Sequence, residues 1–241
     1  MTHHTFDAMG TVGSLTGVSA TAASTVRAIF EEADARFSLY RADSELSRVA
    51  SGAQTMINSS TELRDAYADA LSWRALTGGA FTPNRSDGVV DLNGIVKAKA
   101  MQAAGEALQA GGWLGWSLNV GGDVLVADAH SQSVGIVDPV DRTALLCVVT
   151  LRETRRAMAT SGSAERGDHI WLAGTTERAQ FAQVTVVADD IITADVLATA
   201  IVSGGAPTLN DLTDRWDIDV LAVDRNGAIL ATPGIRTALV V

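Results

Sequence analysis

Two oxygen-bearing side chains stand four residues apart in the segment TADVLATAI of this 241-residue chain. Asp195 and Thr199 would lie one above the other on the same face of a helix, because residues four apart in an α-helix are neighbours. A carboxylate and a hydroxyl are hard oxygen ligands of the kind that Mg²⁺ prefers. The pair therefore indicates a candidate magnesium site, although an aspartate in a first helical turn would also simply stabilise the helix dipole.

A second candidate segment is DLNGIVK, in which Asp91 and the pair Asn93-Gly94 precede a helical pattern. Free N–H groups at the start of a helix can bind a phosphate, and Lys97 would add one cation on the first turns. Gly94 would allow a ligand or a metal ion to approach its carbonyl oxygen closely. An ordinary helix cap followed by a solvated lysine explains the same residues, so this segment alone leaves both interpretations open.

Two further segments combine glycine with polar residues. In the segment NVGGD, which ends at Asp123, a strand meets a glycine pair, and an ordinary hairpin turn explains this pattern almost as well as a ligand site does. The segment ATSG contains Ser161, and His169 follows shortly after. A serine nucleophile is a weak alternative there, because the Gly-x-Ser-x-Gly pattern of a nucleophile elbow is absent from the sequence.

Composition limits the partners of the chain. The formal net charge is −10, and no run of Lys or Arg interrupts the acidic balance, which disfavours nucleic acid or an anionic membrane as the main partner. An acidic protein that binds a diphosphate would use backbone N–H groups, one placed cation or a divalent metal. No apolar run approaches 18 residues, and the first residues do not have the pattern of a signal peptide, so we expect no membrane span and a cytoplasmic location.

Hydrophobic periodicity predicts helices and strands in an order that does not alternate strictly. Helices without strict alternation with strands favour an α+β fold, which we expect to form a single domain over residues 1–241. Thr193 is expected to cap the last helix, and Gly204-Gly205 is expected to end it. The expected helices are 22–37, 61–76, 91–110 and 193–202, and the expected strands are 11–20, 116–127, 133–138, 144–151, 184–188, 218–223 and 227–231.

Each segment alone is too short to indicate a protein family, but the order of the segments along the chain is specific. From about residue 6 to 205 the chain resembles the ApbE-like FAD:protein FMN transferases. The resemblance implies an α+β fold of the ApbE-like, T-fold-related type, with mixed sheets packed against helices. The segments that carry it are AMGT, FSLY, SELSR, GAF, DLNGIVKA, NVGGD, ATSG and ADVLATA.

The resemblance implies that the protein binds FAD and uses Mg²⁺ to cleave its diphosphate. It would leave FMN on a threonine or serine of an acceptor protein and release AMP. His169 would be the catalytic base or a phosphate contact. The implied metal ligands are the Gly94 carbonyl oxygen and the side chains of Asp195 and Thr199, with Ala198 as a further backbone candidate. The implied FAD contacts are Met9, Tyr40, Ala80, Phe81, Thr82, Asp91, Lys97, Ser161 and His169.

The chain departs from the family pattern at three of these positions. His169 precedes Ile-Trp-Leu where the family has Asp-Pro, Lys97 precedes alanine where it has glycine, and Thr82 replaces a common aspartate. Three alternatives therefore stay open: a protein that only binds FAD, a magnesium-dependent FAD diphosphatase that yields FMN and AMP, and a non-catalytic module for flavin storage or partner binding. The sequence does not name the acceptor protein or the oligomeric state.

Overall fold

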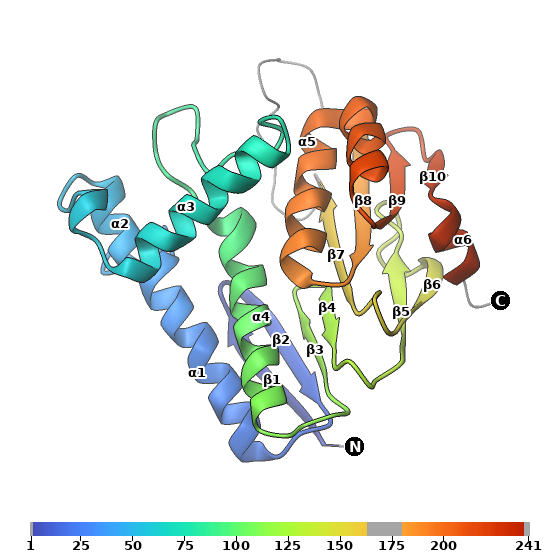
Figure 1. The fold of residues 1–241 in the computed structure, drawn as a ribbon, viewed down its shortest axis with the longest axis horizontal. Helices are drawn as coiled ribbons and strands as arrows, with labels where there is room; N and C mark the ends of the chain where they lie inside the picture. Colours follow the sequence, from blue (N-terminus) through green and yellow to red (C-terminus); the bar gives the residue numbers. More distant parts are fainter. Residues whose placement is uncertain (1, 163–179, 239–241) are drawn as a thin grey trace.

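The computed structural model describes residues 2–162 and 180–238, and its central feature is an eight-stranded antiparallel sheet (Figure 1). The strand order is β1-β2-β3-β4-β7-β8-β9-β10, and the hairpin β5–β6 forms a separate two-stranded sheet. The strands are β1 (His3–Ala8), β2 (Thr11–Thr16), β3 (Ser117–Val120), β4 (Asp123–Val126), β5 (Gln132–Val137), β6 (Leu145–Leu151), β7 (Ala157–Gly162), β8 (Phe181–Ala188), β9 (Asp219–Asp224) and β10 (Ile229–Ala231).

Helices cover one face of this sheet. Helix α4 lies between α1 and α5, and α5 packs against β7 and β8 (Figure 1). The buried side of α1 is formed by Ala23, Val26, Phe30, Ala33 and Phe37, the three-to-four spacing of an amphipathic helix. The helices are α1 (Ala20–Phe37), α2 (Glu45–Ala50), the 3₁₀ turn η1 (Met56–Asn58), α3 (Thr61–Leu76), α4 (Asn93–Ala110), α5 (Ile191–Arg215) and α6 (Pro233–Ala238).

The hairpin β5–β6 and the short helix α6 pack over the other face. Strand β4 contributes side chains to the cores on both faces of the sheet, because successive side chains of a strand point to opposite faces. Leu125 belongs to the core on the helix side, whereas Val124 and Val126 belong to the core under the hairpin. The strand is therefore buried on both sides, and an inward polar residue on it lies deep in the protein.

The α+β class and most predicted elements are confirmed. Helices α1, α3 and α4 begin within two residues of the predicted positions and end at them. The predicted strand 116–127 is two strands, because the positive φ angles of Gly121 (60°) and Gly122 (96°) turn the chain into a hairpin. β1 and α2 are elements that the sequence patterns did not predict.

The predicted cap of the last helix is wrong, whereas the predicted helix break at Gly204-Gly205 is confirmed. Asp190, not Thr193, caps α5, because the Asp190 side chain accepts a hydrogen bond from the Thr193 N–H group at 2.8 Å. Gly205 has a φ of 68° and a ψ of −157°, which are not helical angles, so the first helical segment of α5 ends at the predicted glycine pair and a second segment follows it to Arg215. The Gln180 side chain accepts the N–H group of Ala206 at 2.9 Å and so caps the second helical segment.

Helix α5 is the one described helix that is long and apolar enough to cross a membrane. It packs on β7, β8 and α4 in the centre of the fold, and 56% of its most apolar window is buried. It also carries the buried Asp195. Its hydrophobicity therefore belongs to the protein core.

Candidate active site

Three charged side chains from three elements meet inside the protein. Lys97 lies in the second turn of α4, Asp123 begins β4, and Asp195 is the fifth residue of α5. Their exposed fractions are 8%, 1% and 1%. The Lys97 ammonium group forms an ion pair with Asp123, and its Nζ atom lies 3.7 Å from Asp195 Oδ2. Such buried charges are stable only when they are paired and hydrogen-bonded.

This placement decides two alternatives that the sequence left open. Lys97 is not a solvated lysine, because its side chain is buried between the two carboxylates. Asp195 does not stabilise the dipole from the first turn of α5, which holds no acidic residue. Both residues therefore lie in a built polar cluster in the protein core.

Hydroxyl groups extend this cluster along β7. The Ser161 Oγ and Thr199 Oγ1 atoms are 3.0 Å apart, so β7 is hydrogen-bonded to α5 through the two side chains. The neighbouring Thr160 donates its backbone N–H group to Asp123 Oδ1 at 3.0 Å. Its hydroxyl group pairs with that of Thr185 at 2.9 Å. Asp195 and Thr199 thus lie one turn apart on α5, with Lys97 next to Asp195 and Ser161 next to Thr199.

Asp123 is a residue of this cluster that the sequence patterns do not predict. The segment NVGGD indicates a glycine turn and assigns no role to its last residue. The available signal was the aspartate itself, which directly follows two turn glycines and starts an apolar strand. An aspartate at the start of a doubly covered strand is buried and needs partners.

The oxygen atoms of the cluster fit a magnesium ion. The described residues contain no group of three or more His, Cys, Asp or Glu side chains that could hold a metal. Mg²⁺ does not need one, because it is usually held by one or two carboxylates, with waters and substrate phosphates completing the shell. Asp195, with Thr199 one helical turn further, supplies such a set, and the buried position of the carboxylate is consistent with an ion rather than with solvent contact.

The packing around Gly94 explains why a glycine stands there, which the sequence pattern does not show. A Cβ atom at this position would lie 2.9 Å from the ring of Phe81, so the glycine makes room for that ring on the first turn of α4. Phe81 is buried and receives further support, since its backbone N–H group donates to Thr77 Oγ1 at 3.1 Å. Ala80 lies against Gly204 at the kink of α5. The segment 80–82 is therefore packed between the start of α4 and the kinked part of α5.

The turn between β1 and β2 lies at the same end of the sheet as the glycine turn before Asp123. Met9 has a positive φ of 50° in this tight turn and packs against the main core. The Gly121 N–H group donates to the Val12 carbonyl oxygen at 3.2 Å, and Thr11 contacts the position where a Gly121 Cβ would be. Met9 is thus positioned near the Gly121 turn.

Not all predicted site residues meet at the cluster. Asp91 lies just before Leu92, the N-cap residue of α4, and its Oδ1 atom accepts the Asn93 N–H group at 2.9 Å. Tyr40 lies in the loop between α1 and α2 and is 89% exposed, so the structure does not bring it to the buried cluster. Thr82 accepts the N–H group of Asn84 at 3.2 Å. His169 lies outside the described residues, and the proposed FAD contacts stay predictions.

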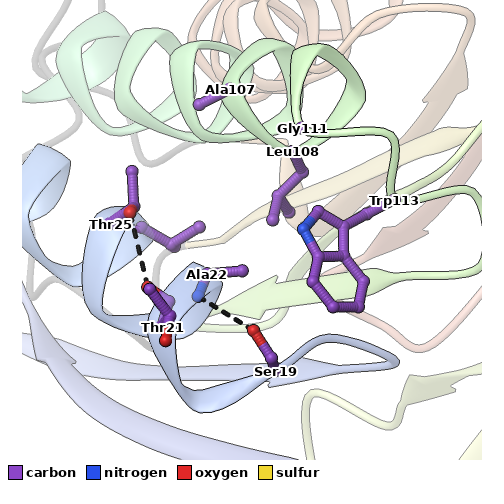
Figure 2. A pocket seen from close by; sticks show the side chains of 9 residues that line it. Ser19, Thr21, Ala22, Thr25, Ala107, Leu108, Gly111 and Trp113 are labelled. Carbon is purple, nitrogen blue, oxygen red and sulfur yellow. Dashed lines mark hydrogen bonds between the residues drawn. The ribbon is translucent and has the colours of Figure 1, made fainter.

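The cavity in Figure 2 is distinct from this cluster. It has a volume of about 230 Å³ and lies between the start of α1 and the end of α4. Ser19, Thr25, Leu108 and Trp113 are among its lining residues, and Ser19 is already occupied as the cap of α1. Lys97 lies at the opposite end of α4, so this cavity is not part of the site.

The fold and the cluster define an α+β protein with a buried carboxylate, lysine and hydroxyl site where α4, α5 and the sheet meet. The model of the ApbE family matches residues 9–89 and 83–222, and the chain belongs to the ApbE family. No curated protein matches the chain.

Three solved structures share the fold over nearly the whole chain. The ApbE protein from Thermotoga maritima is 19% identical, with a TM-score of 0.83 and 98% of each chain covered. The flavin transferase ApbE from Vibrio cholerae is 20% identical, with a TM-score of 0.80 and 99% of each chain covered. The apo flavinyl transferase ApbE from Pseudomonas stutzeri is 20% identical, with a TM-score of 0.77, covering 98% of this chain and 96% of that chain. At these identities the likeness establishes the fold.

Proposed function

We propose that this protein transfers FMN from FAD to a threonine or serine hydroxyl group of an acceptor protein and releases AMP, in a magnesium-dependent reaction. The observation that supports it most is the buried cluster of Lys97, Asp123 and Asp195, next to Thr199, in a chain of the ApbE family. Two of the structures with this fold carry the names flavin transferase and flavinyl transferase.

The atoms of the reaction balance without an oxidant or a reductant. The acceptor hydroxyl oxygen forms a bond to the phosphorus atom of the FMN half. The bond from this phosphorus to the bridging oxygen breaks, and AMP leaves with that oxygen. The hydroxyl proton must be taken up by a base, for which the family resemblance makes His169 the candidate.

Each described part of the site has a task in this reaction. Asp195, Thr199 and the Gly94 carbonyl oxygen would hold Mg²⁺, which would neutralise charge on the diphosphate. A phosphate bound at the start of α4 would replace the Asp91 carboxylate as the acceptor of the Asn93 N–H group. Among the described residues of this cluster, Lys97 is the positively charged one, and its charge would attract the diphosphate.

The test is cleavage of FAD by the purified protein, with AMP and FMN measured by chromatography. We expect AMP release with Mg²⁺ and its loss in EDTA. Asp195→Asn is expected to abolish cleavage while the protein still melts cooperatively. Equal rates in EDTA would refute the metal site, and so would a variant that keeps the rate of the wild type and only melts earlier.

Products without an acceptor separate the proposal from its alternatives. Free FMN together with AMP would indicate an FAD diphosphatase, and intact bound FAD would indicate a binding protein. Transfer itself requires a protein whose mass increases by one covalent FMN, measured by mass spectrometry after incubation with proteins of the source organism. His169→Asn is expected to bind FAD and to lose about 10²–10⁴-fold of the turnover, the usual contribution of a general base.

A further inference from the structure

Asp123 connects the three elements that build the site. One carboxylate oxygen accepts the Thr160 N–H group of β7 at 3.0 Å, and the other side of the carboxylate pairs with Lys97 of α4. Through Lys97 it comes next to Asp195 of α5. With 1% of its surface exposed, Asp123 has no route to contact a large substrate, so any influence on the reaction acts through its neighbours.

Lys97 is held unevenly between its two carboxylates. Its ion pair with Asp123 is direct, whereas its Nζ atom is 3.7 Å from Asp195 Oδ2. That second distance exceeds the roughly 2.7–3.2 Å of an N–H···O hydrogen bond. A small rotation of the flexible lysine side chain would be enough to close it. The direct partner is therefore the carboxylate of the strand, and the carboxylate on the helix is the one proposed to bind the metal.

We infer that Asp123 is a positioning residue, which draws the Lys97 ammonium group toward β4 and so keeps its ion pair with Asp195 long enough for this carboxylate to bind Mg²⁺. The inference rests on the proposed function. A buried ammonium group that loses its anion must find another, since an uncompensated buried charge is strongly unfavourable. Asp195 is already its second partner, so without the Asp123 charge Lys97 would pair with Asp195 more closely and compete with the metal ion.

The variant that isolates this effect is Asp123→Asn. Its side-chain oxygen can still accept the Thr160 N–H group, and its shape is nearly the same, so only the charge is lost. We expect the Mg²⁺ concentration for half-maximal FAD cleavage to rise by about 10-fold or more, the size of effect typical for partners of metal ligands. The rate at saturating Mg²⁺ should change much less, because no ligand of the ion has been removed.

A second substitution distinguishes competition from structural damage. In Asp123→Asn/Lys97→Met the competing cation is gone, and the buried pair is replaced by uncharged groups. Half-saturation by Mg²⁺, measured at saturating FAD, should then return to within about threefold of the wild type, because no ammonium group competes for Asp195. The fold should be retained, since replacing both partners of a buried ion pair often changes stability little. Thermal melting of both variants completes the distinction, because removal of the unpaired lysine charge would also restore a damaged fold. Competition requires that Asp123→Asn needs more Mg²⁺ at temperatures where this variant is fully folded.

The matched control is Asp69→Asn. Asp69 pairs with Lys99, two residues beyond Lys97 on α4, but this pair is at the surface. Surface pairs contribute only about 0–1 kcal/mol, so this variant should keep the Mg²⁺ dependence of the wild type. Calorimetric titration of each protein with Mg²⁺ alone gives a second measurement that does not depend on catalysis.

Three results would overturn the inference: Asp123→Asn with the same Mg²⁺ half-saturation as Asp69→Asn, a double variant no better than the single one, or a wild type that binds no Mg²⁺ in the titration. If Asp123→Asn does not fold, the double variant is the test. A double variant that binds Mg²⁺ about tenfold or more weakly than the wild type would overturn the inference, because Asp123 would then affect the metal ion without Lys97. Absence of FAD cleavage in a wild type that does bind Mg²⁺ would refute the proposed function and leave the role of Asp123 to the titration.

Discussion

Ser161 on β7 and Thr199 on α5 share a hydrogen bond of 3.0 Å between their side-chain oxygen atoms, although they are 38 residues apart in the sequence. This bond joins the segment ATSG to the segment ADVLATA, two parts of the chain that the family resemblance had assigned to FAD and to the metal. It orients the Thr199 oxygen at the edge of the buried cluster. The structure thus offers a physical reason why both segments belong to one site.

Thr199→Val keeps the shape of the side chain but removes this oxygen. We expect the Mg²⁺ concentration for half-maximal FAD cleavage to rise by at least about tenfold, the lower end of what the loss of an outer partner costs. Thr213→Val on the same helix is the control, because the Thr213 hydroxyl group only bonds the backbone of its own helix. Ser161→Ala should have the smaller effect on the metal, since Ser161 acts on Thr199. A Thr199→Val enzyme with unchanged Mg²⁺ dependence would exclude this residue as a ligand.

Gly94→Ala should destabilise the protein. The new methyl group would lie 2.9 Å from the Phe81 ring, and overpacking of this kind typically costs about 1–3 kcal/mol. The gain in helix propensity, about 1 kcal/mol, offsets part of this cost. Urea unfolding measures the difference, and Gly94→Ala/Phe81→Leu should be more stable than the sum of the two single effects. Gly94→Ala at or above wild-type stability would show that Phe81 does not require the glycine.

Gly205→Ala tests the kink of α5. Gly205 has a φ of 68°, which disfavours a residue with a Cβ atom, and that atom would also lie 2.8 Å from Gln180 Oε1. We expect a loss of about 1–3 kcal/mol, the usual range for backbone strain. Gly227→Ala is the control, because Gly227 has a φ of 84° but no atom within 4 Å of its Cβ position. Equal losses in both variants would mean that strain alone, and not the Gln180 contact, sets the cost.

Glu45 gives the fold a pH dependence on the acid side. Burial alone would raise the pKa of the Glu45 carboxyl group, but hydrogen bonds from the Ser60 hydroxyl and N–H groups and from the Gln54 amide outweigh burial and lower the pKa. A lowered pKa means that this stabilisation is present above the unfolded value of 4.5 and disappears as the pH falls through the folded pKa.

The corresponding variant is Glu45→Gln. At pH 7 it should unfold with about 1 kcal/mol less free energy than the wild type, at the low end for charge-assisted hydrogen bonds because the carboxylate is only partly buried. The difference should shrink below pH 4.5, which thermal melts at several pH values would measure. Glu62→Gln, an exposed acidic residue in the first turn of α3, is the control. A difference that stays constant between pH 7 and pH 3 would mean that the Glu45 charge is not its origin.

Local patterns in the sequence determined much of the fold. The apolar spacing of residues 22–37 and 61–76 predicted two amphipathic helices, because a helix period can be read from a few neighbouring turns. Asn226-Gly227 likewise predicted the hairpin of β9 and β10. The pairing of Asp195 with Thr199 on one helix face is also a local property, since four residues fix it.

Only the tertiary structure decided what depends on distant segments. The partners of Lys97 come from residues 26 and 98 positions further along the chain, and no local pattern shows whether a lysine is solvated or buried between two aspartates. The continuation of α5 past Gly205 depends on Gln180, and the reason for Gly94 is the ring of Phe81. The role of Asp123 depends on distant segments in the same way, because the burial and charge pairing of its side chain are set by what packs around it, whereas its sequence neighbours indicate only a turn.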